Sequence, residues 1–165
     1  DRPGRHQDPG GQMVAARRAR GFTLPELLAV VAVMAILATI AAPSFSELIA
    51  SQRAKGAASD MFASLLRTRS EAIKRNVEVT LAKSGEGWED GWSIAHPTDA
   101  DILLEDRAAV PGATITGPAS VTYLPNGRVK GATAPEFDIE VSGAGQQRCI
   151  GVDLSGRPYQ TKAAC

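Results

Sequence analysis

The sequence predicts an α+β protein in which one long N-terminal helix packs on a mostly antiparallel β domain. Two observations support this fold class. Residues 22–42 are an apolar run with a single charge, and residues 43–76 continue with apolar residues at spacings of three and four, the period of a helix. From residue 77 onward, apolar and polar residues alternate, which is the period of a strand.

The apolar run is long enough to span a membrane. Its 21 residues, at about 1.5 Å rise each, cover a hydrocarbon layer of about 30 Å. A cleaved secretory signal usually has a shorter apolar core of about 7 to 15 residues, and buried helices of soluble proteins are rarely apolar without interruption over this length. A plain signal anchor explains the length and the preceding Arg17, Arg18 and Arg20, but not an acid inside the run. We therefore predict a membrane-spanning helix.

The acid inside the run is Glu26. An ionised carboxylate in the membrane costs about 2 to 3 kcal/mol near a helix centre and less near its end, so Glu26 needs a partner. Cleavage between Gly21 and Phe22 would place a new α-ammonium about one helical turn away. The same carboxylate could face the new terminus of a neighbouring copy, and such pairing would favour one axial register between subunits.

Residues 21–28, GFTLPELL, resemble the prepilin-peptidase signal of type IV pilins. The resemblance implies that the peptidase cleaves after Gly21, that Phe22 becomes the methylated N-terminus, and that Glu26 is the assembly acid. Pro25 stands where many members carry an aliphatic residue. A proline in the first helical turn removes only an N–H that has no partner there, so it is compatible with this resemblance.

The distribution of charge predicts the orientation of the chain. Basic residues precede the apolar run, so the positive-inside rule places the N-terminus in the cytoplasm and residues 77–165 in the periplasm, with a single pass through the bacterial inner membrane. Residues 1–21 are then a leader peptide. Met13 is an alternative start, which would make residues 1–12 a disordered extension or a start-site artefact. Residues 77–165 carry 12 acidic against 7 basic residues, so the exported domain is acidic.

Residues 43–76 are predicted to continue the helix as an amphipathic segment. Pro43 should kink the helix without ending it, and Asn76 should end it because asparagine tolerates the left-handed conformation. The predicted apolar face comprises Phe45, Leu48, Ile49, Ala58, Met61, Phe62, Leu65, Leu66, Ala72 and Ile73. The opposite face carries Arg53, Lys55, Arg67, Arg69, Lys74 and Arg75. We interpret that basic face as a solvated surface, with a binding stripe as the alternative.

Residues 77–165 are predicted to form short strands joined by turns and loops. Alternation favours strands over residues 77–81, 88–94, 102–104, 113–115, 121–124, 137–141 and 150–154. Asn126-Gly127 predicts a tight two-residue hairpin turn, because both residue types accept positive φ angles. Trp88 and Trp92 are expected to pack in the core, and the alternative is an exposed stacking platform.

Catalytic and metal chemistry find little support. The two histidines are His6, in the leader or the extension before it, and His96, in a loop, so a nucleophile lacks a partner base. No His/Cys cluster has metal-ligand spacing. The acids Asp99, Asp101, Glu105 and Asp106 lack a calcium-loop pattern and are expected to lie in a solvated loop. We expect neither enzyme activity nor a metal or other cofactor.

The two cysteines, Cys149 and Cys165, are predicted to form a disulfide, because an even pair in an exported domain is typically oxidised. Closing this loop would stabilise the fold by about 3 kcal/mol through the unfolded state. The loop and its edge carry Arg148, Arg157 and Lys162. Such bases could neutralise phosphates, which gives an alternative function in DNA contact.

Four stretches are similar to the GspH/FimT group of minor pilins and pseudopilins. They are residues 57–60, 69–76 and 88–92, and the ending from Arg148-Cys149 through Gly156-Arg157 to Cys165. The resemblance covers nearly the whole chain from Gly21 and implies a pilin-like fold assembled into a thin filament or its tip. Some FimT-like members bind DNA through a Gly-Arg-x-Arg element. The matching residues here are Gly156-Arg157-Pro158-Tyr159, in which tyrosine replaces the second arginine.

The sequence thus predicts a membrane-anchored minor pilin or pseudopilin. After leader cleavage and N-methylation by prepilin peptidase, it would assemble with other pilins or pseudopilins into a type IV pilus or a type II secretion pseudopilus. The alternative is a DNA-binding minor pilin for natural transformation that uses the C-terminal disulfide loop.

Overall fold

The computed structural model describes residues 22–143, 145 and 147–165. Gly21 and the rest of the predicted leader lie outside the described residues, as do the start at Met13 and the basic residues before the apolar run. The chain divides into two compact units, Asp1–Thr39 and Ile40–Cys165.

A single helix, α1 (Leu24–Arg75), continues from the first unit into the second. In the first unit the large apolar side chains from Phe22 to Leu37 are 44–78% exposed. An 18-residue window of this helix has a mean hydropathy of 2.4, so the helix is long and apolar enough to cross a membrane.

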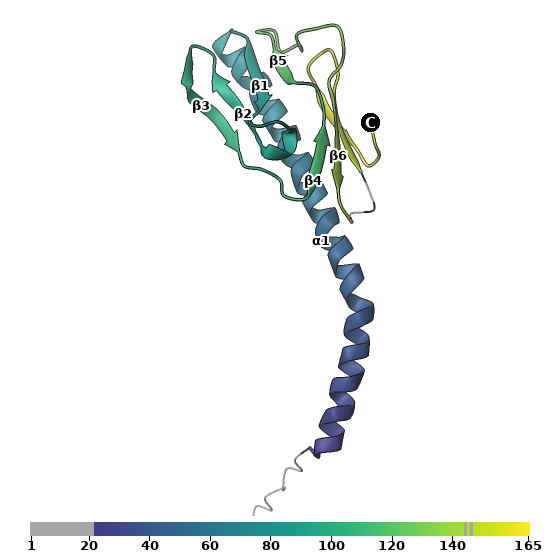
Figure 1. The fold of residues 1–165 in the computed structure, drawn as a ribbon. Helices are drawn as coiled ribbons and strands as arrows, with labels where there is room; N and C mark the ends of the chain where they lie inside the picture. Colours follow the sequence, from purple (N-terminus) through teal and green to yellow (C-terminus); the bar gives the residue numbers. More distant parts are fainter. Residues whose placement is uncertain (1–21, 144, 146) are drawn as a thin grey trace, which may run out of the picture. The chain divides into compact units, whose positions relative to one another are not determined.

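The second unit contains two four-stranded antiparallel sheets (Figure 1). The first has the order β3-β2-β1-β5 and comprises β1 (Val79–Lys83), β2 (Trp92–His96), β3 (Asp99–Arg107) and β5 (Ser120–Tyr123). The second has the order β4-β6-β7-β8 and comprises β4 (Ala113–Thr116), β6 (Glu136–Val141), β7 (Arg148–Val152) and β8 (Pro158–Thr161). A 3-10 helix, η1 (Trp88–Asp90), precedes β2. The predicted α+β class is confirmed.

The core of the second unit joins both sheets to one face of α1. The helix contributes Ala57, Ala58, Met61, Leu65 and Ala72, all buried. The sheets and their connections contribute Val79, Leu81, Trp88, Trp92, Ile94, Ile115, Val121, Tyr123, Val129, Phe137, Ile139, Ile150 and Val152. Small helical residues allow the aromatic side chains of the sheets to approach the helix closely.

Both tryptophans belong to this core, as predicted. Trp88 packs edge-on against Phe137 with ring centroids 4.9 Å apart, and its indole N–H donates to the carbonyl of Pro118 at 2.7 Å. Trp92 is fully buried. Their burial excludes the exposed stacking platform.

The end of α1 confirms the role predicted for Asn76. Its φ is 55°, its N–H donates to Ile73 O at 3.3 Å, and the N–H of Val77 donates to Ala72 O at 3.3 Å. This pattern is a Schellman motif, which satisfies two carbonyls of the last turn and sends the chain toward β1.

Several predicted details of the β region are wrong. Residues 88–90 form η1 instead of a strand, because Gly91 has a φ of 104° and strand pairing with β1 begins only at Trp92. The hairpin after β5 has a three-residue connection. Gly127 N–H donates to Leu124 O and Leu124 N–H to Arg128 O, both at 2.8 Å, and only Gly127 takes the positive φ. Strand β8 was not predicted.

The apolar face of α1 also begins later than predicted. Phe45, Leu48 and Ile49 are more than half exposed, and the buried positions start at Ala50 and Ala54. Exposed large apolar side chains are therefore present on α1 beyond residue 42 as well.

Candidate functional site

Of the residues predicted for processing and assembly, the structure describes Phe22 and Glu26, which lie at the start of α1. Thr23 is the N-cap, since its carbonyl accepts the first helical bond from Leu27 N–H at 3.1 Å. Glu26 lies three positions later, and its Oε2 accepts the N–H of Thr23 at 3.4 Å. This is the carboxylate half of a capping box. The helix start therefore holds the Glu26 carboxylate beside the backbone N–H of Thr23, the residue that directly follows Phe22.

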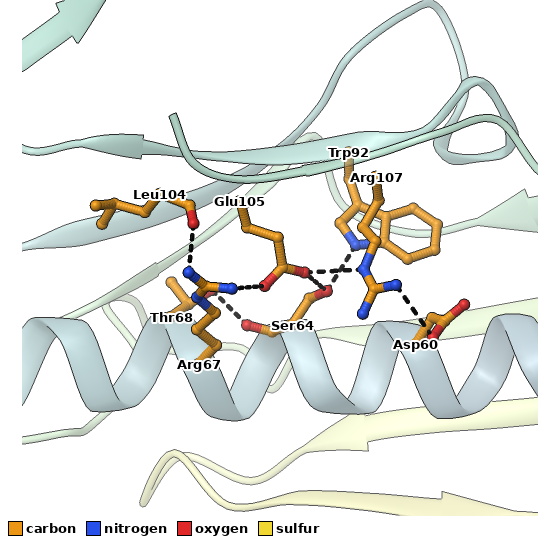
Figure 2. Close-up of polar contacts among 8 residues, drawn as sticks. All are labelled: Asp60, Ser64, Arg67, Thr68, Trp92, Leu104, Glu105 and Arg107. Atoms are coloured by element: carbon orange, nitrogen blue, oxygen red, sulfur yellow. Dashed lines mark hydrogen bonds and ion pairs between the residues drawn. The ribbon is translucent and has the colours of Figure 1, made fainter. Parts of the chain in front are cut away.

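A buried polar network fixes the second half of α1 on β3 (Figure 2). At its centre, the hydroxyl of Ser64 donates to Glu105 Oε1 and accepts the indole N–H of Trp92 at 2.8 Å. Ser64 and Thr68 are fully buried, and the Thr68 hydroxyl donates to Ser64 O at 2.7 Å. Each of these polar groups has a partner, as burial requires.

Two arginines complete the network around Glu105, whose side chain is 8% exposed. Arg67 lies 3.3 Å from Oε2 and also donates to the carbonyl of Leu104. Arg107 lies 3.2 Å from Oε1 and reaches Asp60 at 3.4 Å. The expectation of a solvated acidic loop is wrong, because Asp99–Arg107 is a strand and Glu105 is almost buried; Asp99, Asp101 and Asp106 are exposed.

The basic face of α1 is more than a solvated surface. Besides Arg67, Arg69 donates to Gly127 O at 2.9 Å and to Ser155 O at 3.3 Å, so it connects two turns far apart in sequence. Arg75 donates to Glu71 at 2.6 Å and to His96 at 2.7 Å. The Arg75 hydrogen bond lowers the pKa of Glu71. Periodicity located this face but could not identify which arginines contact the domain.

The turns that Arg69 connects pack closely. A Cβ on Gly156 would lie 1.9 Å from Gly127 O, and both glycines have positive φ. Within the second turn, Asp153 Oδ1 accepts the Ser155 hydroxyl at 2.5 Å and the N–H of Arg157 at 3.0 Å. These hydrogen bonds lower the pKa of Asp153, with the Ser155 bond as the largest cause. Arg157 is thus held at the start of β8 beside an acidic residue.

The disulfide Cys149–Cys165 is present, with a Cα–Cα distance of 5.0 Å. Cys149 pairs with Asp138 in the β6–β7 register, and Cys165 Sγ contacts Phe137 O at 3.3 Å. The segment after β8 therefore folds back to β7 and β6.

The three predicted DNA-contact residues do not form one cluster. Arg148 is buried on β7, opposite Ile139 of the core, and Lys162 follows the end of β8, so these two line one pocket. Arg157 precedes the start of β8, about 16 Å away along an extended strand. A DNA contact that uses all three stays a prediction.

Within the described residues, no group of three or more His, Cys, Asp or Glu side chains is arranged to hold a metal ion.

Comparisons with known families match two parts of the chain. The family described as type II transport protein GspH matches residues 57–156, which is more than half of the chain. The prokaryotic N-terminal methylation motif matches residues 16–42, the segment that contains Gly21, Phe22 and Glu26. A comparison with curated proteins found no significant match.

Solved structures share the fold. The type IV minor pilin FimU of Pseudomonas aeruginosa is 20% identical, with a TM-score of 0.58 over 67% of this chain and 89% of that chain. The minor pseudopilin EpsH from the type 2 secretion system of Vibrio cholerae is 14% identical, with a TM-score of 0.54 over 67% of this chain and 97% of that chain. With its long helix, two antiparallel sheets and N-terminal methylation motif, the chain belongs to the GspH family and is a minor pilin or pseudopilin.

Proposed function

We propose that the chain is a single-pass protein of the bacterial inner membrane, with a cytoplasmic N-terminus and a periplasmic C-terminal domain. Prepilin peptidase would cleave it after Gly21 and methylate Phe22. The mature chain would then assemble with other pilins or pseudopilins into a type IV pilus or a type II secretion pseudopilus. The chain would act in the filament as a structural subunit, with Glu26 as its assembly residue.

The exposed apolar surface of α1 carries this proposal. Large apolar side chains from Phe22 to Leu37 lie 44–78% exposed, and the exposure continues at Phe45, Leu48 and Ile49. A surface of this size needs a cover, because each buried Å² of apolar surface is worth about 25 cal/mol. Lipid would cover it before assembly, and the helices of neighbouring subunits would cover it in the filament.

The position of Glu26 supports its assignment as the assembly residue. Its carboxylate already lies 3.4 Å from the N–H of Thr23. Cleavage would create a cationic α-amine at Phe22, one residue further back. That amine, in the same chain or in a neighbour, is the partner a carboxylate in an apolar environment needs.

Replacing Glu26 tests this proposal in cells that assemble the filament. Glu26→Ala should leave membrane insertion intact and abolish incorporation, measured by immunoblots of membranes and of sheared filaments. Glu47→Ala is the matched control, since it removes the next carboxylate along α1. Normal incorporation of Glu26→Ala would reject the assignment of Glu26.

The cleavage site has a separate test. Gly21→Val should leave the leader attached, and intact-mass spectrometry of the membrane-extracted protein should show the unprocessed mass. A mature, methylated Phe22 terminus in this variant would show that cleavage does not depend on Gly21.

A further inference from the structure

A pocket of about 300 Å³ lies between α1 and the end of the second sheet. It is lined by Lys55 and Ser59 of α1, Arg148 of β7, Gln160 of β8 and Lys162 just beyond β8. Three of these five residues are cationic and none is acidic. All five belong to the second unit. The pocket is therefore strongly positive, although residues 77–165 are acidic overall.

Arg148 is the most buried cation of the pocket, and no carboxylate among the described residues forms an ion pair with it. It is 8% exposed, and its buried Nε has no hydrogen-bond partner among the described residues. The nearest carboxylate in the strand register, Asp138, pairs with Cys149, so it lies on the opposite face of the sheet from Arg148. The Nε group has lost its hydration without gaining an acceptor, which destabilises the fold.

The other arginines that are at least partly buried differ from Arg148 in this respect. Arg69 donates to Gly127 O at 2.9 Å, Arg75 to Glu71 at 2.6 Å, and Arg107 to Glu105 at 3.2 Å. Arg148 is more buried than any of them and is without such an acceptor in the part of the chain that the structure describes. An acceptor from outside the chain would give Arg148 the hydrogen-bond partner that the other three arginines find within it.

We propose that Lys55, Arg148 and Lys162 form a binding site for one tetrahedral oxyanion, a phosphate or sulfate group. A guanidinium presents parallel N–H donors that match two oxygens of such a group, and two lysines add point charges around it. The Gln160 amide can supply a further N–H. Ser59 contributes an acceptor oxygen only, because its hydroxyl already donates to Lys55 O at 2.9 Å.

Calorimetric titration of the full chain in non-ionic detergent tests this site. Inorganic phosphate should bind at one site per chain, whereas sodium chloride at equal ionic strength should give no saturable heat. Lys55→Gln and Lys162→Gln should each weaken phosphate binding by about tenfold, since each removes one charge-assisted contact. These two side chains are exposed, so the variants should fold.

Arg157→Gln is the matched control, because it removes a cation from the same disulfide loop outside the pocket. It should leave the phosphate affinity within about twofold. Arg148→Lys should retain weaker binding than the native chain, because lysine cannot reproduce the two-pronged contact.

Three outcomes would overturn the proposal. One is the absence of saturable phosphate binding to the native chain. Another is an equal loss in Arg157→Gln and Lys162→Gln, which would indicate a diffuse basic surface. The third is binding of a short DNA duplex without binding of inorganic phosphate, which would assign the pocket to DNA contact. None of these outcomes bears on filament assembly, which the Glu26 and Gly21 variants test.

Discussion

Tyr123 is fully buried in the core. Its hydroxyl has no hydrogen-bond partner among the described residues. Burial raises the pKa of Tyr123 well above its ordinary value. The folded state therefore favours the neutral phenol. The stability associated with keeping Tyr123 neutral is present below the ordinary tyrosine pKa of about 10 and is lost as the pH rises above that value.

Tyr123→Phe should accordingly leave the unfolding free energy at pH 7 unchanged or raise it by about 1 kcal/mol, because an unsatisfied hydroxyl is removed from the core. It should also reduce the loss of stability above about pH 10. Denaturant unfolding between pH 7 and 11 measures both effects, with Tyr159→Phe, a change at a partly exposed tyrosine, as the control. A marked loss of stability at pH 7 would show that the hydroxyl has a partner.

Glu105 is the residue whose role differs most from the prediction. Its carboxylate accepts from Ser64 and neutralises Arg67 and Arg107. Glu105→Ala should lower the unfolding free energy by about 2 kcal/mol. This is less than for a fully buried pair, because Arg67 and Arg107 are 51% and 40% exposed and can regain water.

The matched control for Glu105 is Glu78→Ala, which breaks the exposed Lys130–Glu78 pair. Surface pairs contribute at most about 1 kcal/mol. Chemical denaturation should therefore show a larger loss of unfolding free energy for Glu105→Ala than for Glu78→Ala. Equal effects would mean that Glu105 acts as an ordinary surface charge.

At the scale of elements, β8 depends on two constraints. Among the described strands it pairs with β7 alone, from Cys149↔Thr161 to Val152↔Pro158, and the disulfide fastens the segment that follows it. Cys165→Ala should lower the unfolding free energy by about 3 kcal/mol. Amide exchange should increase first in β8, because it is the edge strand of its sheet.

The control for this prediction is reductant, which should destabilise the native chain and leave Cys165→Ala unchanged. Uniform loss of amide protection across both sheets would show that β8 does not unfold separately. Cys165 is the better position for the substitution, since it is exposed, whereas loss of the buried Cys149 side chain would also leave a cavity.

Elements with a clear hydrophobic periodicity could be predicted from the sequence. Elements that depend on the backbone angles of one glycine could not. The helix and its end at Asn76 followed from apolar spacing and one residue type. The 3-10 turn at Trp88–Asp90 did not, because it depends on the positive φ of Gly91. Strand β8 was missed because its burial pattern shows no alternation that a sequence could reveal.

At the scale of the whole molecule, the sequence alone predicted a long apolar helix followed by a β region and the disulfide, because each depends on composition or on residues close in the chain. It could not place Arg148 beside Lys55, or Glu105 beside Ser64, because those contacts depend on which sheet face meets the helix. The candidate DNA residues illustrate the same limit. Neighbours in sequence, Arg157 and Lys162, lie at opposite ends of one strand.

Two carboxylates at distant places in the fold contribute to the acid stability of the domain. Hydrogen bonding to Arg75 lowers the pKa of Glu71, and hydrogen bonding to Ser155 and Arg157 lowers that of Asp153. A lowered folded-state pKa adds stability above the ordinary carboxylate pKa of about 4, and this stability is lost as the pH falls through the lowered value. The unfolding free energy should thus decline with acidification below about pH 5.

The double variant Glu71→Gln, Asp153→Asn tests this origin of the decline. It should be less stable than the native chain at pH 7, and its stability should fall less steeply on acidification, so the two curves should converge at low pH. Tyr123→Phe is the control, since it alters the alkaline side and should preserve the acid slope. Denaturant unfolding of the full chain in non-ionic detergent from pH 7 to 2 gives the slopes. Parallel curves for the native chain and the double variant would assign the acid decline to other groups, because the slope counts the protons that unfolding takes up.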